Sequence, residues 1–376
     1  MSSPREIMRQ AMDLRQPSRI PLMCQLSIGH MLQQLDVSPL EFWHDPVVFA
    51  QGICRLREIY HFDGVLVSLH GHDPDWRVGI RSRRQTPEGE EVTWSDGTVL
   101  LYVQDDLPRP IESHSPSFGG IDQALDALPS TLSYIPVSQG LRFLLHRDHM
   151  FEIFTSVRAE IGSGYSLHGE ITSPFDYFLD HCGHQRGLMY LLTEPKKAGA
   201  VLGHFTTLVK GLSVRMCGAG IDAVKISSPF AGRGFIPPEL YSEFVLPFER
   251  EIAGAVRAHD VHIYTHTCGA ISDRLELLFD AGVSGIECLD PPPLGDVELS
   301  DAKKRIGKRG FIKGNIDSVN TLLYGTTEQI LEDARRRIEV GKKGGGFILS
   351  TACSVAPHVD REKLLLLRDA VDRWGT

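Results

Sequence analysis

The chain has 376 residues, of which 42% are hydrophobic and 23% are charged, and its formal net charge is −9 at pH 7. This composition is typical of a globular protein with a large core, and it excludes a fibrous or largely disordered chain. The acidic charge leaves no basic stripe for a phosphate backbone, so we expect no nucleic-acid partner.

The sequence also lacks an apolar run long enough to span a bilayer, and its start, MSSPREIMRQ, has no signal-peptide core. We therefore expect a cytoplasmic protein without membrane contact. The cysteines are scattered and odd in number, which in a reducing compartment favours free thiols or metal ligands over a disulfide framework. They are Cys24, Cys54, Cys182, Cys217, Cys268, Cys288 and Cys353.

Eight apolar runs rich in β-branched and aromatic residues alternate with helical patterns along the chain. They begin at Ile20, Gly64, Tyr165, Asp222, His262, Gly285, Phe311 and Phe347. Eight buried strands alternating with helices predict a closed parallel (β/α)8 barrel, formed by residues 1–376 as a single domain. A doubly wound sheet would usually show fewer strands and a glycine-rich turn after the first, and no such turn follows residues 20–25.

Helix signals lie between these runs. Capping boxes at Ser3 and Ser38 mark two helix starts, and apolar residues after Pro195 recur with helical spacing. Residues 76–104 break the alternation, because their apolar residues recur with period two around the turn sequences TPEG and SDG. This segment predicts a β-hairpin or three-stranded meander inserted after the second strand.

In a (β/α)8 barrel the active site is built at the carboxyl ends of the strands. The predicted strand ends carry Cys24, Gln25, His70, His72, Glu170, Lys225, His266, Cys268, Glu287, Cys288, Asp290, Asn315, Asp317 and Cys353. This set is too polar for a purely structural rim, so we expect the active site there.

His266 and Cys268 lie two residues apart on one strand, so their side chains point the same way. On its own this motif favours a chance pair, with Cys268 as a small buried hydrophobe. Cys353, at the end of another strand, reverses that preference, because imidazole and thiolate are the donors that zinc accepts and that magnesium and calcium do not prefer. Glu287 is either a fourth ligand, a partner of His266 or a substrate contact.

A zinc ion held by two thiolates is electron-rich and has little Lewis acidity left for activating water. It is well suited to bind a substrate thiol and keep it as a nucleophilic thiolate. The ligands therefore favour alkyl transfer to sulfur over hydrolysis.

Three further candidates for catalysis are Tyr177, Glu170 and Lys225. Tyr177 either hydrogen-bonds substrate or packs near a helix start. Lys225 either binds an anionic group or forms an internal ion pair with Glu170.

Candidate substrate-binding residues lie at other strand ends. His70 and His72, with Asp73, favour substrate hydrogen bonding over a second metal site. Asn315 and Asp317 are either site residues or local turn formers. The remaining cysteines, Cys288 among them, are interpreted as structural thiols.

Five stretches together resemble the uroporphyrinogen decarboxylase superfamily, which includes haem-pathway decarboxylases and zinc-dependent methyltransferases of corrinoid and coenzyme M systems. They are GEITSPFDYFLDHCG (169–183), residues 222–249, HTCG (266–269), KGNID (313–317) and GGGFILSTACSVAP (344–357). The resemblance covers most of the chain and implies a (β/α)8 barrel.

Within that superfamily, the decarboxylase pattern is mostly absent. Its arginine-rich first loop corresponds to MCQLSIGH, with Cys24 in place of the first arginine; His70 stands where an aspartate is expected and Cys353 where a histidine is expected. Tyr177 alone matches. His266, Cys268 and Cys353 instead resemble the zinc methyltransferases, and their order also resembles the zinc site of cobalamin-independent methionine synthase.

The resemblance thus implies a zinc-dependent methyltransferase in which a small thiol accepts a methyl group from a corrinoid protein or a small donor. The alternatives are a porphyrinogen-type carboxy-lyase and a non-catalytic barrel that binds a corrinoid or another ligand. No Asp-x-His-x-x-Gly pattern is present, so any corrinoid is expected on a partner protein. The sequence leaves the oligomeric state open.

Overall fold

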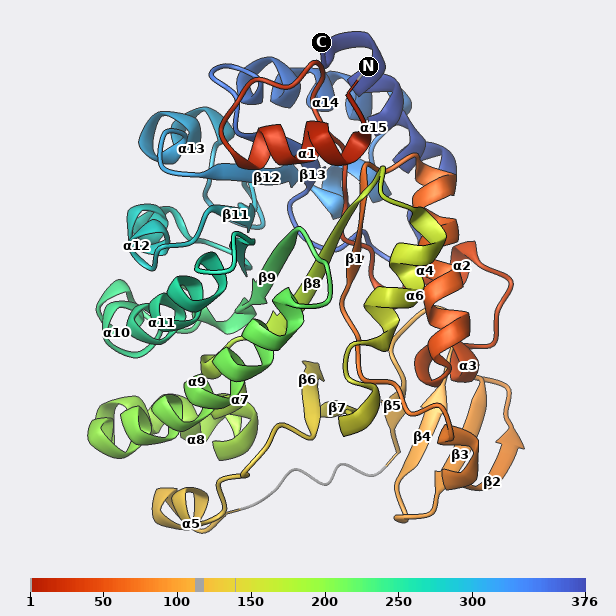
Figure 1. The fold of residues 1–376 in the computed structure, drawn as a ribbon, viewed down its shortest axis with the longest axis vertical. Coiled ribbons are helices and arrows are strands. Elements are labelled where there is room, and N and C mark those ends of the chain that lie inside the picture. Colours follow the sequence, from red (N-terminus) through yellow and green to blue (C-terminus); the bar gives the residue numbers. More distant parts are fainter. Residues whose placement is uncertain (1, 112–117, 139) are drawn as a thin grey trace.

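The structure is a computed structural model that describes residues 2–111, 118–138 and 140–376. It has an α/β fold whose centre is a curled parallel sheet of seven strands (Figure 1). In spatial order these are β1 (Gly64–Val67), β8 (Ser166–Thr172), β9 (Ala223–Ser227), β10 (His262–Thr267), β11 (Gly285–Cys288), β12 (Phe311–Ile316) and β13 (Phe347–Thr351). Most strand residues are buried, as expected for a parallel sheet covered by helices.

The first expected strand, residues 20–26, is irregular. It makes isolated parallel bridges from Leu22 to Leu349 and from Leu26 to Val355, while Asp63 N donates to Leu22 O on its other side (2.9 Å). Pro21 has no N–H, and Leu22 N donates to the Asp63 carboxylate (2.8 Å) instead of to a strand carbonyl. Seven of the eight expected strands are therefore regular, and the eighth segment lies beside β13 and the start of β1.

Helices alternate with the strands and surround the sheet (Figure 1). They are α1 (Pro4–Met12), α2 (Ile28–Gln34), α3 (Pro39–His44), α4 (Pro46–Tyr60), α5 (Ile121–Asp126), α6 (Glu152–Ile161), α7 (Pro174–Cys182), α8 (His184–Thr193), α9 (Pro195–Cys217), α10 (Pro238–Phe244), α11 (Leu246–Arg257), α12 (Leu275–Asp280), α13 (Leu299–Ile306), α14 (Thr327–Gly341) and α15 (Arg361–Trp374). The expected starts are confirmed, because Ser3 and Ser38 cap α1 and α3 and Pro195 opens α9. In the part of the chain that the structure describes, no helix is both long and apolar enough to cross a membrane.

Two antiparallel sheets lie between β1 and β8 in the sequence. One contains β2 (Ile80–Gln85), β3 (Glu90–Trp94), β4 (Val99–Tyr102) and β5 (Arg109–Pro110), and the other contains β6 (Tyr134–Ser138) and β7 (Leu141–Leu144). The first sheet packs on α3 through His44, whose Nε2 lies 2.6 Å from the Tyr102 hydroxyl and whose ring stacks on Trp76.

A buried ion pair fixes the irregular segment to the sheet. Arg19 donates to both carboxylate oxygens of Asp63, with N–O distances of 2.8 and 2.5 Å. The Asp63 side chain is 2% exposed and that of Arg19 is 22% exposed, so the pair is poorly screened by water. The same carboxylate accepts from Leu22 N, and it therefore positions the segment that carries Cys24 and Gln25.

We expect Asp63→Asn to lower the free energy of unfolding by about 2–4 kcal/mol, because it leaves Arg19 without its counter-charge. Urea unfolding followed by circular dichroism measures the change. Glu58→Gln, which removes an exposed pair with Arg55 (52% and 64% exposed), is the control and should change it by less than about 0.5 kcal/mol. Equal effects in the two variants would show that the buried pair does not hold this segment.

Candidate functional site

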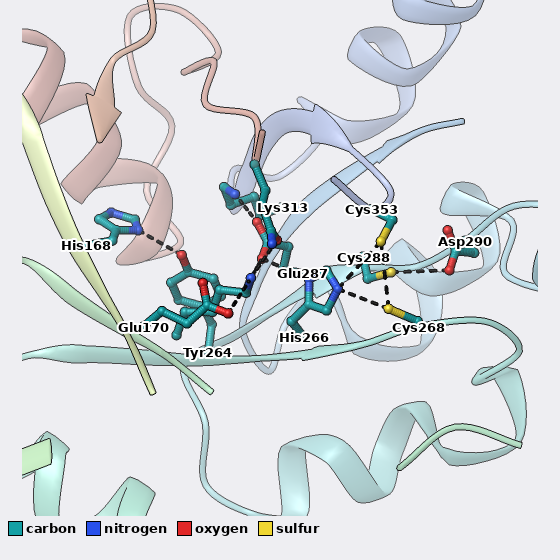
Figure 2. Close-up of polar contacts among 12 residues, drawn as sticks. His168, Glu170, Tyr264, His266, Cys268, Glu287, Cys288, Asp290, Lys313 and Cys353 are labelled. Atoms are coloured by element: carbon teal, nitrogen blue, oxygen red, sulfur yellow. Dashed lines mark hydrogen bonds and ion pairs between the residues drawn. The ribbon is translucent and has the colours of Figure 1, made fainter. Parts of the chain in front are cut away.

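Four soft donors converge at the carboxyl ends of three strands (Figure 2). His266 lies at the end of β10 and Cys268 directly follows that strand, Cys288 ends β11, and Cys353 follows β13. The ligand atoms of these four residues all lie within 4.8 Å of one another. The structure thus brings together the three donors predicted from sequence and adds a fourth.

The distances between the donor atoms fit a metal ion with tetrahedral coordination. His266 Nε2 lies 3.2 Å from Cys268 Sγ and 3.9 Å from Cys353 Sγ, and the two sulfurs are 3.8 Å apart. Metal–ligand distances of about 2.3 Å for sulfur and about 2.0 Å for nitrogen imply edges of roughly 3.8 Å between sulfurs and roughly 3.5 Å between nitrogen and sulfur. The donor set and its geometry therefore fit zinc.

The charges within the cluster favour metal binding as well. Burial and Lys225 lower the pKa of His266, but Cys268 and Cys353 more than offset them, so this pKa lies well above its ordinary value. Hydrogen bonding from Cys268 holds the pKa of the Cys353 thiol well below its usual range. Both directions show that negative charge on sulfur is favoured beside the imidazole, and a metal cation that replaced the imidazole proton would be favoured by the same charge.

Glu287 lies on the opposite side of the imidazole from the sulfurs (Figure 2). Its Oε2 is 3.0 Å from His266 Nδ1 and 3.4 Å from Lys225 Nζ, and its Oε1 accepts from Lys313. Burial raises the pKa of Glu287, but Lys313 and Lys225 lower it by a larger amount, so this pKa lies well below the ordinary value. Of the three roles left open by the sequence, this geometry matches a partner that fixes the His266 tautomer with Nε2 free to bind metal.

The sequence reasoning missed Cys288, which it interpreted as a structural thiol. Strict strand alternation places Cys288 on the face opposite Glu287, but the backbone is left-handed at Cys288 (φ 86°) and at Leu289 (φ 59°). Its sulfur therefore reaches the cluster, and it also donates to Asp290 Oδ2 (3.3 Å), which accepts from Gly269 N (2.7 Å). Its position after Glu287 at a strand end was the available signal.

Lys225 is fully buried and forms an ion pair with Glu170 (3.3 Å), as one of its two sequence interpretations proposed. Burial lowers its pKa, but Glu170 and Glu287 raise it above the ordinary value, so the lysine stays charged. Its Nζ also donates to Gln25 Oε1 (2.5 Å).

A cavity of about 290 Å³ opens beside the donor cluster. Its wall includes Thr172 at the end of β8, Ser227 at the end of β9, and Ser354. Ser227 is the register partner of His266 and Ser354 directly follows Cys353, so the cavity adjoins the metal-ligand candidates. Of the polar residues at the predicted strand ends, Gln25 and Glu170 line this cavity, and the others do not appear in its described wall.

Tyr177 is buried in α7 and is not among the described lining residues of the cavity. Its hydroxyl donates to Tyr134 O (2.8 Å) and its ring stacks on Phe205 with 5.4 Å between ring centroids. These contacts match the packing interpretation.

The two histidines after β1 are also buried in apolar surroundings. The His70 ring lies 6.1 Å from the rings of Phe151 and Phe154, and the His72 ring lies 4.8 Å from that of Phe143. Burial lowers the pKa of His70 to about 4 and that of His72 to about 3, so both are neutral near pH 7. The structure does not bring them to the donor cluster.

Asn315 and Asp317 hold backbone in place. Asn315 donates to Leu289 O (2.8 Å) and accepts from Arg337, so it supports the left-handed turn after Cys288. Asp317 caps the π-helix Ser318–Leu323 by accepting from Val319 N (2.9 Å). Their described contacts are therefore structural.

Comparison with known proteins gives matches of two kinds. Residues 142–374 match the uroporphyrinogen decarboxylase (URO-D) family. The chain is 25% identical over 234 residues to the methylcobamide:CoM methyltransferase MtaA of Methanosarcina barkeri, covering 61% of this chain and 66% of that protein. It is 28% identical over 196 residues to the uroporphyrinogen decarboxylase of Thioalkalivibrio sulfidiphilus, covering 50% and 52%. The chain thus spans about half to two-thirds of these relatives.

Solved structures support the fold. A methyltransferase from Methanosarcina mazei has a TM-score of 0.75 at 16% identity, covering 99% of both chains. A B12-independent methionine synthase from Shewanella sp. W3-18-1 has a TM-score of 0.54 at 12% identity, covering 95% of this chain and 98% of that one.

A pH-dependent stability follows from Asp176, a buried carboxyl in the cavity wall that accepts from Ser173 Oγ (2.5 Å). Burial raises its pKa to about 8, from 3.8, so the folded protein keeps a proton that the unfolded chain releases. This contribution to the free energy of unfolding is lost as the pH rises from about 4 to about 8.

The side chain of Asp176→Asn stays uncharged at every pH. We therefore expect the free energy of unfolding of this variant, relative to that of wild type, to rise by about 1–3 kcal/mol between pH 5 and pH 8. Urea unfolding at the two pH values measures this difference. Asp96→Asn, in an exposed turn, should follow the wild-type profile. If the free energy of unfolding had the same pH dependence in wild type and in Asp176→Asn, the raised pKa of Asp176 would be contradicted.

Proposed function

The chain belongs to the uroporphyrinogen decarboxylase family, and we propose that it acts there as a zinc-dependent methyltransferase that activates a thiol acceptor. The observation that carries this proposal is the convergence of His266 Nε2 and three cysteine sulfurs within 4.8 Å. Family membership alone does not choose the activity, because methyltransferases and decarboxylases match with similar identity. The donor cluster favours the methyltransferase.

We propose that His266, Cys268 and Cys353 hold the metal and that a substrate thiol takes the fourth position. In this proposal Cys288 does not ligate the metal and keeps the proton that it donates to Asp290. A zinc ion bound in this way would act as a Lewis acid and lower the pKa of the substrate thiol, whose proton would pass to water. Glu287 orients His266 through Nδ1, and the two buried lysines keep this carboxylate charged.

In the proposed reaction, the thiolate sulfur attacks the methyl carbon. The S–C bond forms while the bond between the methyl group and its carrier breaks, and the electron pair stays on the carrier. The carrier is either a methylated corrinoid on a partner protein, as the name methylcobamide:CoM methyltransferase implies for the relative, or a small methyl compound.

The cavity argues against the carboxy-lyase alternative. A porphyrinogen with eight carboxylates needs cationic partners, and no lysine or arginine occurs in the described part of the cavity wall. The tyrosine shared with the decarboxylase pattern, Tyr177, packs in the core.

We also propose that the curled sheet is completed by residues 20–26 into one (β/α)8 barrel comprising the whole chain. Leu22 supports this proposal, because it contacts Leu349 of β13 on one side and Asp63, next to β1, on the other.

We expect purified protein to contain about one zinc ion per chain, and Cys268→Ala or Cys353→Ala to reduce this to near zero. Elemental analysis after gel filtration measures the metal content. Cys288→Ala should retain zinc, and Cys182→Ala, which removes a buried thiol from α7, controls for folding. Full zinc content in Cys353→Ala would contradict the proposed ligand set.

We further expect the zinc-loaded protein to transfer the methyl group of methylcobalamin to a small thiol, with loss of activity by at least about 100-fold in His266→Ala. The visible spectrum of the corrinoid follows the reaction, and circular dichroism checks that the variant is folded. Full transfer by chelated, zinc-free protein would contradict the proposal. Consumption of uroporphyrinogen by that protein would favour the carboxy-lyase instead.

A further inference from the structure

The cavity beside the donor cluster is lined by carboxyl groups and not by strong cations. Asp106, Glu170, Asp176 and Asp180 contribute to its wall, and the described lining residues include no lysine or arginine. Residues 112–117 and 139 lie outside the described residues, and their sequence contains no lysine or arginine either.

Among the described residues, Lys225, Arg142 and Arg109 form ion pairs with carboxylates of this wall. Lys225 Nζ contacts Glu170 (3.3 Å) and Glu287 (3.4 Å), and Arg142 donates to Asp180 Oδ2 through Nε (3.0 Å) and Nη2 (2.7 Å). Lys225 is fully buried, so its charge is committed to the two glutamates. In the described part of the wall, an anionic group would therefore meet no unpaired lysine or arginine.

Among the described residues, one carboxyl group of the wall has no lysine or arginine partner, and another has only an exposed one. Asp176 accepts only from the hydroxyl of Ser173 among the described residues, and Asp106 lies 3.5 Å from Arg109, with both side chains more than half exposed. His184 supplies an exposed imidazole, which packs edge-on against Phe230 with 4.7 Å between ring centroids. In the described wall, four carboxyl groups thus accompany one imidazole.

The remaining wall combines apolar side chains, such as Trp43, Leu69 and Ile135, with uncharged polar ones, such as Gln25 and Ser68. Moving a sulfonate or carboxylate from water into such a cavity without a counter-charge costs several kcal/mol. An uncharged tail avoids that cost, and a cationic tail gains from the carboxylates and from aromatic faces.

We propose that the thiol substrate of this protein carries an uncharged or cationic tail and not a sulfonate or a carboxylate. This inference rests on the proposed thiol-binding metal centre, and it distinguishes the chain from the relatives whose names specify coenzyme M, a thiol with a sulfonate tail.

Three thiols with the same two-carbon spacer test the inference: 2-mercaptoethanol, cysteamine and 2-mercaptoethanesulfonate. The protein is reconstituted with cobalt(II), and each thiol is titrated while the sulfur-to-cobalt charge-transfer absorption is recorded. We expect the neutral and cationic thiols to bind at least about tenfold more tightly than the sulfonate. Equal or tighter binding of the sulfonate would overturn the inference.

Two charge variants sharpen the test. Asp106→Lys introduces a cation into the wall and should improve sulfonate binding relative to 2-mercaptoethanol by at least about threefold. Asp96→Lys makes the same change of net charge in an exposed turn and should leave the ratio unchanged. A ratio that moves equally in both variants would also overturn the inference, because it would reflect net charge and not the cavity.

The two proposals fail in different ways in this experiment. Absence of sulfur-to-cobalt absorption in wild type contradicts the metal centre, and the inference falls with it. Normal absorption together with preferred binding of the sulfonate contradicts the inference alone.

Discussion

The candidate site depends on one buried carboxylate, that of Glu287. One of its oxygens accepts from Lys313, and the other lies within 3.4 Å of both His266 Nδ1 and Lys225 Nζ. Lys225, Lys313 and Glu287 are at most 1% exposed, so water contributes little to their solvation. Because an unpaired charge at this depth would cost several kcal/mol, the charges must stay together, and this requirement fixes the imidazole that faces the three sulfurs.

Much of this arrangement could be predicted from the sequence, because it follows from regular backbone. The carboxyl ends of parallel strands meet at one edge, and residues two apart on a strand point the same way. These two rules were enough to place His266, Cys268 and Cys353 together. The seven strands of the parallel sheet could also be predicted, since each is a short buried run between turn signals.

The remaining features depend on contacts or on irregular backbone. Cys288 reaches the cluster through a left-handed backbone that no local pattern announces. His70 and Tyr177 carry polar atoms at predicted strand or helix ends, but only the packing of distant aromatic residues shows that they are buried in the core. Residues 20–26 depart from a regular strand because Asp63, far along the chain, accepts from Leu22 N.

The charge network that orients the metal-ligand candidate also shapes the neighbouring cavity. Lys225 could have served an anionic substrate, since Gln25 and Glu170, which it contacts, both line the cavity. Its charge is instead shared between Glu170 and Glu287, and the second of these pairs holds His266 in place. A lysine released to bind a sulfonate would leave the glutamates short of one positive charge in the protein interior. The support of the donor cluster and the lack of a free lysine in the described cavity wall therefore have the same physical cause.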